Sequence, residues 1–485
     1  MYSADERIIL GSLVIVYFLF LFAISVWINK TSIKTYDDYN VAGRTVSIFP
    51  LILTFVGTAV GGSTLLGYME NGYSLGMGQQ WINLGTFFAG LIMLGFFLDK
   101  IRAYGDKYDM VTIADYTTLR YGEGARIPTV ISILVAYSAI TGMQFVAIAT
   151  ILNLTVGLSM TTGILVSWVL LTLKTYFGGM KSVIWQDAFH GTIQTIGLFI
   201  LFVAVILASG GWSSIQQNAS ILNESANLSL FSSITPQEIF VYLLTIGAYQ
   251  FVRQDLWQRY WAAGSAKVAK RGYWISIVVA GLTGAAVIAI GVMGKYGLGL
   301  TDANPTLIYY AVIGDVFNFP MVIIMIIALL ATVISTADSF FMAGASSIVN
   351  DIIRPRMSQY DDKKLLLYSR YSVIAVSVLS LVLALYIPQL VNLWVTGTAM
   401  LVSSLLAPII LGFYWKPATK KGGVAGMWTG LIVAVIWQFT GHPFGIHPVF
   451  VGLPISTIVT VIVSLMKAED HVDLLAEERE VEVSS

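Results

Sequence analysis

Thirteen long apolar runs constrain the fold of this chain more than any other feature of its sequence. A transmembrane helix needs about 20 predominantly apolar residues, and each run approaches or exceeds that length. Hydrophobic residues make up 56% of the chain and charged residues only 11%, whereas soluble domains carry about 25% charged residues. The sequence therefore predicts an all-α polytopic membrane protein with about 13 transmembrane helices. The runs cover approximately residues 8–28, 49–73, 80–99, 127–156, 161–177, 182–209, 238–262, 272–296, 319–348, 367–387, 390–414, 424–441 and 447–466.

Positive charges fall almost entirely on one side of the predicted membrane. With the N-terminus outside, 24 of the 27 Lys and Arg residues are assigned to the inner side, the exceptions being Arg7, Arg253 and Lys295. Such an excess marks cytoplasmic loops. The first run follows Asp5 and Glu6 and lacks a small-residue cleavage site, so we expect it to stay in the membrane. The prediction is a multi-pass protein of the cell membrane, with its N-terminus outside and its C-terminus in the cytoplasm.

Residues 1–466 are predicted to form one transmembrane domain, and residues 467–485 a short acidic cytoplasmic tail. The longest outer loop carries three triplets of the N-glycosylation type, at Asn218, Asn223 and Asn227. Such triplets arise easily by chance in a loop rich in Ser and Asn, so they carry little weight here.

Composition also excludes several classes of function and of binding site. The chain has no cysteine, which excludes disulfides and thiolate metal sites, and a formal net charge of zero, which gives no reason to expect nucleic acid. It has no phosphate-binding loop, so ATP is not the expected energy source. We therefore expect a transporter driven by an ion gradient rather than an enzyme, embedded in the lipid bilayer and without an obligatory protein partner.

The run from Phe49 to Tyr73 is weakened at its middle. Gly57, Gly61 and Gly62 interrupt it, and each glycine weakens a helix interior by about 1 kcal/mol relative to alanine. An unwound turn in hydrocarbon leaves carbonyls without partners, so it persists only beside a cavity or an ion. Close packing of helices through small residues is the alternative explanation.

A second run, 238–262, is also interrupted, at Gly247, and polar residues follow it. The two interrupted runs lie five helices apart, which would make helices 2–6 and 7–11 two halves of opposite orientation. Paired interruptions at corresponding positions are the best sequence indication of a transport site. This pairing favours the cavity explanation for the first run.

Asp187 lies within an apolar run, where an ionisable group costs at least about 2.5–3.5 kcal/mol without a partner. It is either a cation-binding carboxylate or the partner of Lys181, two turns away. His190 follows one turn later on the same face. A neutral, hydrogen-bonding role is the favoured interpretation of this histidine, and proton relay is the alternative.

Thr332, Ser335 and Thr336 share one face of the predicted helix 319–348. Hydroxyls and free carbonyls are the hard oxygen ligands that a small cation requires, so this face is a candidate sodium site beside the interrupted helix. Hydrogen bonding of the hydroxyls to their own helix is the alternative. Asp338 lies off this face, and we interpret it as a helix-packing partner rather than a ligand.

Arg253 follows the second interruption, deep in a span. An arginine there could bind a substrate carboxylate through two parallel hydrogen bonds. It could equally pair with Asp255, or with Asp187 from across the bundle. These alternatives stay open at the level of the residues alone.

Six ordered motifs resemble the sodium:solute symporter family over about residues 10–466. The resemblance implies sodium-driven alternating access and a five-plus-five inverted-repeat core like that of LeuT, with helix 1 and helices 12–13 peripheral. The motifs are YDDYNVAGRTVS, GTAVGGSTLLG, GGMKSVIWQD, RQDLWQRYWAAGSAKVAKRG, ISTADSFFMAGASSIVNDI and FYWKPATKKGGVAGMWTG.

The resemblance also implies particular ligands for one or two sodium ions. The principal ion would be held by the carbonyls of Gly57, Val60 and Thr332 and by Ser335 and Thr336. A second sodium ion would be held by Asp187 with the same hydroxyls.

The resemblance places the solute between the interrupted helices. The six positions that the resemblance implies for the solute offer too few hydrogen-bond acceptors for a polyol. An amino acid or other small carboxylate, bound through Arg253, is therefore favoured over a sugar. Proton coupling through Asp187 and His190 is one rival. A solute sensor on the same fold is another, although the tail after residue 466 is too short for a signalling domain. The positions are Ser63, Thr64, Asn83, Arg253, Gln254 and Met400.

Overall fold

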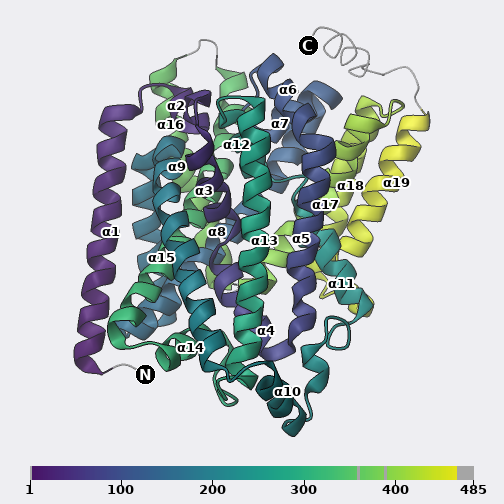
Figure 1. The fold of residues 1–485 in the computed structure, drawn as a ribbon. Helices are drawn as coiled ribbons and strands as arrows, with labels where there is room; N and C mark the ends of the chain where they lie inside the picture. The colour runs from purple at the N-terminus through teal and green to yellow at the C-terminus, as the bar shows by residue number, and fades with distance from the viewer. Residues whose placement is uncertain (1–2, 358–360, 387–389, 467–485) are drawn as a thin grey trace.

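A computed structural model describes residues 3–357, 361–386 and 390–466, and these are almost entirely helical (Figure 1). Their α-helices are α1 (Ala4–Ser32), α2 (Tyr36–Val41), α3 (Ile48–Ala59), α4 (Tyr68–Leu75), α5 (Gln80–Ile92), α6 (Leu98–Tyr108), α7 (Ile113–Tyr121), α8 (Arg126–Val156), α9 (Met160–Ala208), α10 (Trp212–Ile221), α11 (Pro236–Tyr242), α12 (Gln254–Ala262), α13 (Ala266–Tyr296), α14 (Ile308–Val316), α15 (Phe319–Ser347), α16 (Asp362–Tyr386), α17 (Leu390–Tyr414), α18 (Lys420–Phe439) and α19 (Val449–Met466).

The predicted all-α, polytopic membrane fold is confirmed. Within the described ranges, ten helices are long and apolar enough to cross a membrane, or up to eleven if the bent pair α3–α4 is one span. Apolar side chains such as Leu19, Phe199 and Leu207 are 62–79% exposed on the outer faces, where lipid would cover them. The count of thirteen spans stays a prediction, and the predicted tail 467–485 lies outside the described residues.

Helix α9 contains two of the predicted spans, 161–177 and 182–209. A straight helix of its 49 residues would be roughly 74 Å long, about twice the thickness of a bilayer core. Gly179 interrupts it with φ 61° and ψ 177°, a conformation that is essentially restricted to glycine. The first arm begins beside α8, where Gly163 packs against Ala149, and the second arm ends where Ser209 packs against Gly297 after α13. The interruption therefore divides α9 into two arms.

Two segments break at mid-span, and they run in opposite directions through the bundle (Figure 1). The first break lies at Val60 and Gly61, between α3 and the π-helix Ser63–Gly67, and the chain bends there by 55°. The second lies between the π-helix Leu243–Gly247 and α12. Its non-helical residues are 250–253, so the prediction of a break at Gly247 itself was wrong by one turn.

Small residues let the helices around the first break approach closely. A Cβ added at Gly72 of α4 would lie 2.3 Å from the Ile288 carbonyl oxygen of α13. A Cβ at Gly291 would lie 2.2 Å from the Met69 carbonyl oxygen. Such backbone contacts are how membrane helices gain packing energy without a hydrophobic driving force. They fix α4 against α13 and hold the broken segment in the middle of the bundle.

Candidate functional site

The first break lies against the hydroxyl face of α15. The Thr336 hydroxyl donates to the Gly57 carbonyl oxygen at 3.3 Å and to the Thr332 carbonyl oxygen at 3.2 Å. A Cβ at Gly57 would lie 2.8 Å from Ser335 Oγ, and one at Gly61 would lie 2.7 Å from Thr336 Oγ1. The glycines therefore permit the close helix approach that brings carbonyls and hydroxyls together, so the packing and cavity explanations describe one feature.

We call Gly57, Val60, Thr332, Ser335 and Thr336 the α3–α15 oxygen site. Val60 is buried and lies in the break, with φ −106° and ψ 89°. Its N–H donates to the Val56 carbonyl oxygen at 3.0 Å. The oxygens of this site come from backbone and hydroxyl groups, which are hard and formally uncharged ligands. Chemically, the site fits a small monovalent cation.

Asp187 lies beside this site, fully buried. Ser335 Oγ donates to its Oδ1, and Thr54 Oγ1 donates to its Oδ2 at 2.6 Å. The alternative partner weighed from the sequence, Lys181, instead pairs with Asp38 at 2.9 Å. The predicted packing role of Asp338 is confirmed: Lys174 and Thr175 of α9 both bind its carboxylate from the neighbouring helix.

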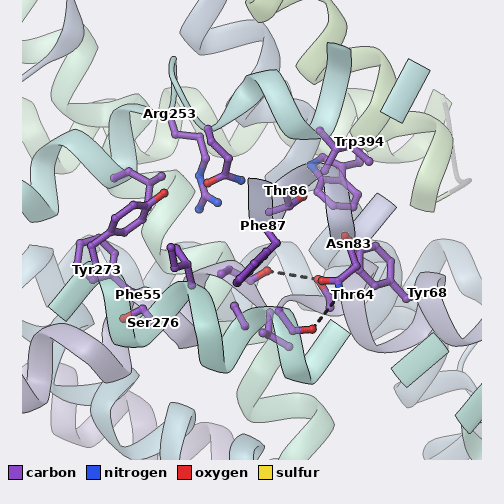
Figure 2. A pocket seen from close by; sticks show the side chains of 18 residues that line it. Phe55, Thr64, Tyr68, Asn83, Thr86, Phe87, Arg253, Tyr273, Ser276 and Trp394 are labelled. Carbon is purple, nitrogen blue, oxygen red and sulfur yellow. Dashed lines mark hydrogen bonds between the residues drawn. The ribbon is translucent and has the colours of Figure 1, made fainter. Parts of the chain in front are cut away.

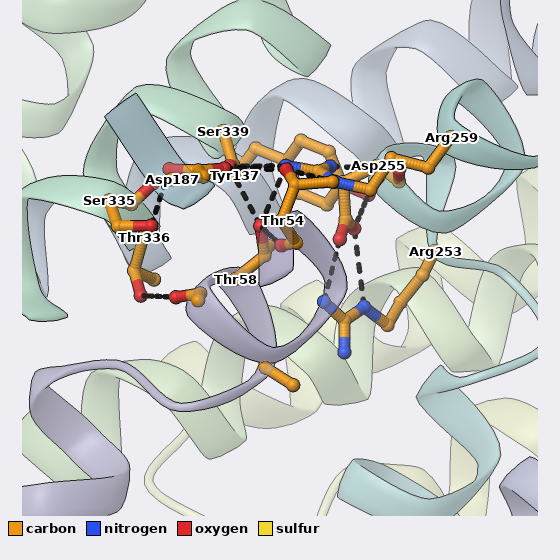
Figure 3. Close-up of polar contacts among 12 residues, drawn as sticks. Thr54, Thr58, Tyr137, Asp187, Arg253, Asp255, Arg259, Ser335, Thr336 and Ser339 are labelled. Atoms are coloured by element: carbon orange, nitrogen blue, oxygen red, sulfur yellow. Dashed lines mark hydrogen bonds and ion pairs between the residues drawn. The ribbon is translucent and has the colours of Figure 1, made fainter. Parts of the chain in front are cut away.

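Arg259 is the residue that sequence reasoning missed. It was counted among the inner-side charges, whereas the structure buries its side chain completely, 3.4 Å from Asp187 Oδ2 (Figure 3). It also donates to Thr54, Thr58 and Ser339. The available signal was its spacing from Asp255, since positions four apart share a helix face.

A cavity of about 60 Å³ lies beside the broken segments (Figure 2), and Val60 of the α3–α15 oxygen site also lines it. Of the predicted solute positions, Thr64, Asn83 and Arg253 line it; the structure does not describe the side chain of Ser63. Aromatic side chains form much of the remaining wall, a contribution the sequence did not predict. They are Phe55, Tyr68, Phe87, Tyr273 and Trp394.

Gln254 and Met400 do not line this cavity. Gln254 is fully buried, and its amide donates to the Ala343 carbonyl at 2.6 Å and to Ser347 Oγ at 2.8 Å. Met400 packs in a separate apolar cluster with Leu431. Gln254 directly follows a cavity residue in the sequence, but this position did not determine which way its side chain points.

Arg253 enters the cavity wall already paired. Its Nε and Nη2 donate to the two Asp255 carboxylate oxygens at 3.2 and 2.6 Å, and Tyr137 donates to the same carboxylate at 2.9 Å. Its Nη1 makes no hydrogen bond to any described residue. The lining contains no acidic side chain among the described residues. Arg253 Nη1 is therefore the charged group in this wall that can donate hydrogen bonds to an anionic solute.

His190 does not make the hydrogen bond predicted for it. Both ring nitrogens are buried without a partner among the described residues, and the ring lies 6.2 Å from that of Tyr17. It packs between α1 and α9 rather than facing the cavity.

Comparison with known proteins establishes the class of protein that this geometry belongs to. The model of the sodium:solute symporter family matches residues 39–430. The chain belongs to the sodium:solute symporter family, and it is therefore a transmembrane secondary transporter of a family that couples solute to sodium.

A curated relative supports the family assignment, and two solved structures support the fold. The chain is 25% identical over 477 residues to the sodium/proline symporter of Staphylococcus aureus (strain JH9), covering 93% of this chain and 91% of the relative. A Na⁺-coupled sialic acid symporter, solved substrate-bound and outward-open, matches with a TM-score of 0.79 at 18% identity, over 96% of this chain and 99% of that one. Mhp1, a nucleobase-cation-symport-1 family transporter, matches in a closed conformation with a TM-score of 0.57 at 14% identity, over 88% and 92% of the two chains. These structures show the shared LeuT-like fold.

Proposed function

We propose that this protein imports a small amino acid or similar small carboxylate across the cell membrane together with sodium. The observation that carries the proposal is the placement of two sites on the same broken segment. The α3–α15 oxygen site and the cavity containing Arg253 both adjoin it, and Val60 belongs to both. An ion and a solute that share one flexible backbone break can each change the affinity for the other.

The cavity chemistry supports a carboxylate over a sugar. Arg253 Nη1 is available to a carboxylate oxygen, and Asn83 Nδ2 is already engaged by the Gly281 carbonyl at 2.9 Å (Figure 2). The aromatic side chains of Tyr68 and Trp394, which stack on each other with ring centroids 6.1 Å apart, suit an apolar or cationic part of the solute. This pattern matches a zwitterionic solute better than a polyol, and sodium/proline symporters are among the relatives.

Sodium at the α3–α15 oxygen site favours the outward-open state in this mechanism. The ion bridges α3 and α15, so it stabilises the position of α3, whose residues Phe55 and Ala59 line the cavity. Its release to the cytoplasm then weakens solute binding, because the coupling requires different affinities in the two states. The inward direction follows from the sodium gradient, which is directed into the cell and drives the coupled solute the same way.

Uptake of labelled amino acids into proteoliposomes tests this function. We expect uptake that requires an inward sodium gradient, and a strong loss of sodium dependence in the double variant Ser335→Ala, Thr336→Ala. Ser346→Ala is the matched control, since Ser346 is a buried α15 hydroxyl that bonds Asn40, away from the site. Uptake indifferent to the sodium gradient would refute the proposal. A thermal-shift screen of amino acids, carboxylates and sugars, with and without sodium, would identify the solute.

A further inference from the structure

Asp187 lies in a buried pocket made of oxygen atoms. Thr54 and Thr58 contribute hydroxyls from α3, and Ser335 and Ser339 contribute hydroxyls from α15. A carboxylate surrounded by hydroxyls is a suitable environment for a hard cation. The chemistry of this pocket therefore calls for a positive charge, as a buried carboxylate must be paired.

The positive charge that fills this pocket is the Arg259 guanidinium (Figure 3). Its Nη2 lies 2.6 Å from Thr58 Oγ1, 2.6 Å from Ser339 Oγ and 3.4 Å from Asp187 Oδ2. Its Nε donates to Thr54 Oγ1 at 3.1 Å. The hydroxyl oxygens that could ligate an ion beside Asp187 Oδ2 are thus already used as acceptors by one side chain of the protein.

Arg259 also connects this pocket to the solute cavity. Its Nη1 donates to the Asp255 carbonyl oxygen at 3.0 Å, and the Asp255 carboxylate holds Arg253 in the cavity wall. The four charged side chains, two aspartates and two arginines, sum to zero and are all buried. An additional cation at Asp187 would leave this network with an uncompensated buried charge, which is costly in a low-dielectric interior.

We propose that Arg259 is the resident cation of the Asp187 pocket, so that the protein binds one sodium ion, at the α3–α15 oxygen site. This inference rests on the proposed function and specifies its stoichiometry. It replaces the sequence-based expectation of a second sodium at Asp187. Arg259 acts as a positioning residue: it ties α3 and α15 to α12, and through Asp255 it holds Arg253 toward the solute.

Sodium binding alone tests this proposal, without knowledge of the solute. Purified protein would be titrated with ²²Na⁺ in a scintillation proximity assay, and the number of sites per chain and the Hill coefficient measured. We expect one site and a Hill coefficient near 1 for the wild type and for Arg259→Lys, which keeps the charge. In Arg259→Gln the uncompensated Asp187 pocket opens to a second ion, so the number of sites doubles. Adding Asp187→Asn to that variant returns the number to one.

Two sodium ions in the wild type, or one in folded Arg259→Gln, would overturn the inference. If Arg259→Gln does not fold, the wild-type count still decides it, because two bound ions in a protein that keeps Arg259 would overturn the inference. No bound sodium in the wild type would refute the proposed function itself, which separates that failure from a wrong stoichiometry.

Discussion

Arg253 is the charged side chain among the described cavity-lining residues, and it reaches the cavity while held by Asp255 through two hydrogen bonds. The pairing of Arg253 with Asp255 has two effects. It neutralises the guanidinium when no solute is bound, and it fixes the planar group so that Nη1 is oriented before the solute arrives. Pre-organisation of this kind reduces the ordering cost of binding.

Replacing Arg253 by lysine is expected to weaken solute binding while leaving sodium binding intact. An ammonium group cannot keep the two-bond geometry with Asp255 and also contact the solute. A hydrogen bond to a charged group contributes about 1.5–3 kcal/mol, so the KM for solute should rise roughly 10- to 150-fold. Uptake as a function of solute concentration measures this. Arg126→Lys is the control, because Arg126 also binds a carboxylate, Glu123, with two bonds of 2.8 Å, but at the surface. Equal KM values in both variants would contradict the role of Arg253.

At the scale of elements, the approach of α3 to α15 depends on a missing side chain. Gly57→Ala would place a Cβ 2.8 Å from Ser335 Oγ and 3.6 Å from the Asp187 carbonyl oxygen. Either the Ser335 hydroxyl must then move away from the site or the helices must separate, and overpacking of this kind costs about 1–3 kcal/mol. We expect the sodium concentration for half-maximal uptake to rise roughly 5- to 150-fold.

Gly314→Ala provides the matched comparison for this substitution. Gly314 lies in α14, and an added Cβ there meets no atom within 4 Å. Alanine is the better helix former by about 1 kcal/mol, so this variant should transport normally and be slightly more stable. A sodium dependence of Gly57→Ala that matches Gly314→Ala would show that the close approach is not required.

Most helices could be predicted from the sequence because apolar length is a local property. The predicted limits 127–156 and 319–348 agree with α8 and α15 to within one residue. The break at 250–253 was misplaced because contacts with distant helices, rather than glycine alone, select which turn unwinds. The gap between the predicted spans 161–177 and 182–209 contains Gly179, so hydropathy also located the division of α9 into two arms.

The site was only partly predictable for the same reason. Thr332, Ser335 and Thr336 were found because three hydroxyls repeat on one helix face. Arg259 was missed because its partner Asp187 is 72 positions away along the chain, and sequence proximity to a basic loop suggested an inner location. The aromatic cavity wall was missed because cavity aromatics cannot be told from interfacial ones by composition.

At the scale of the whole molecule, an ion pair ties the loop after α10 to the end of α13. Lys295 Nζ lies 2.6 Å from Glu224 Oε2, and the Tyr296 hydroxyl donates to the same oxygen at 2.7 Å. Hydrogen bonds from Lys295 and Tyr296 lower the pKa of Glu224 below its usual range. A lowered pKa stabilises the fold at pH values above the ordinary glutamate pKa, and this contribution is lost as the pH falls through the folded-state pKa.

The melting temperature of detergent-solubilised protein should therefore fall more between pH 6 and pH 4 in the wild type than in Glu224→Gln. The Glu224 side chain is 36% exposed, so solvent screening limits the difference to below about 1 kcal/mol. Differential scanning fluorimetry across this pH range measures it. Parallel pH profiles for the two proteins would show that the pair does not stabilise this loop.

The charges predict the orientation of the molecule in the membrane, and this prediction can be tested directly because the chain contains no cysteine. Helix α10 and the start of α16 lie at opposite ends of the bundle (Figure 1), and Ser213 and Lys363 are exposed on them. Lys and Arg concentrate at the α16 end, which the positive-inside rule assigns to the cytoplasm. A membrane-impermeant maleimide should therefore label Ser213→Cys in intact cells, and Lys363→Cys only after permeabilisation. The reverse pattern would contradict the predicted orientation, with the N-terminus outside and the C-terminus in the cytoplasm.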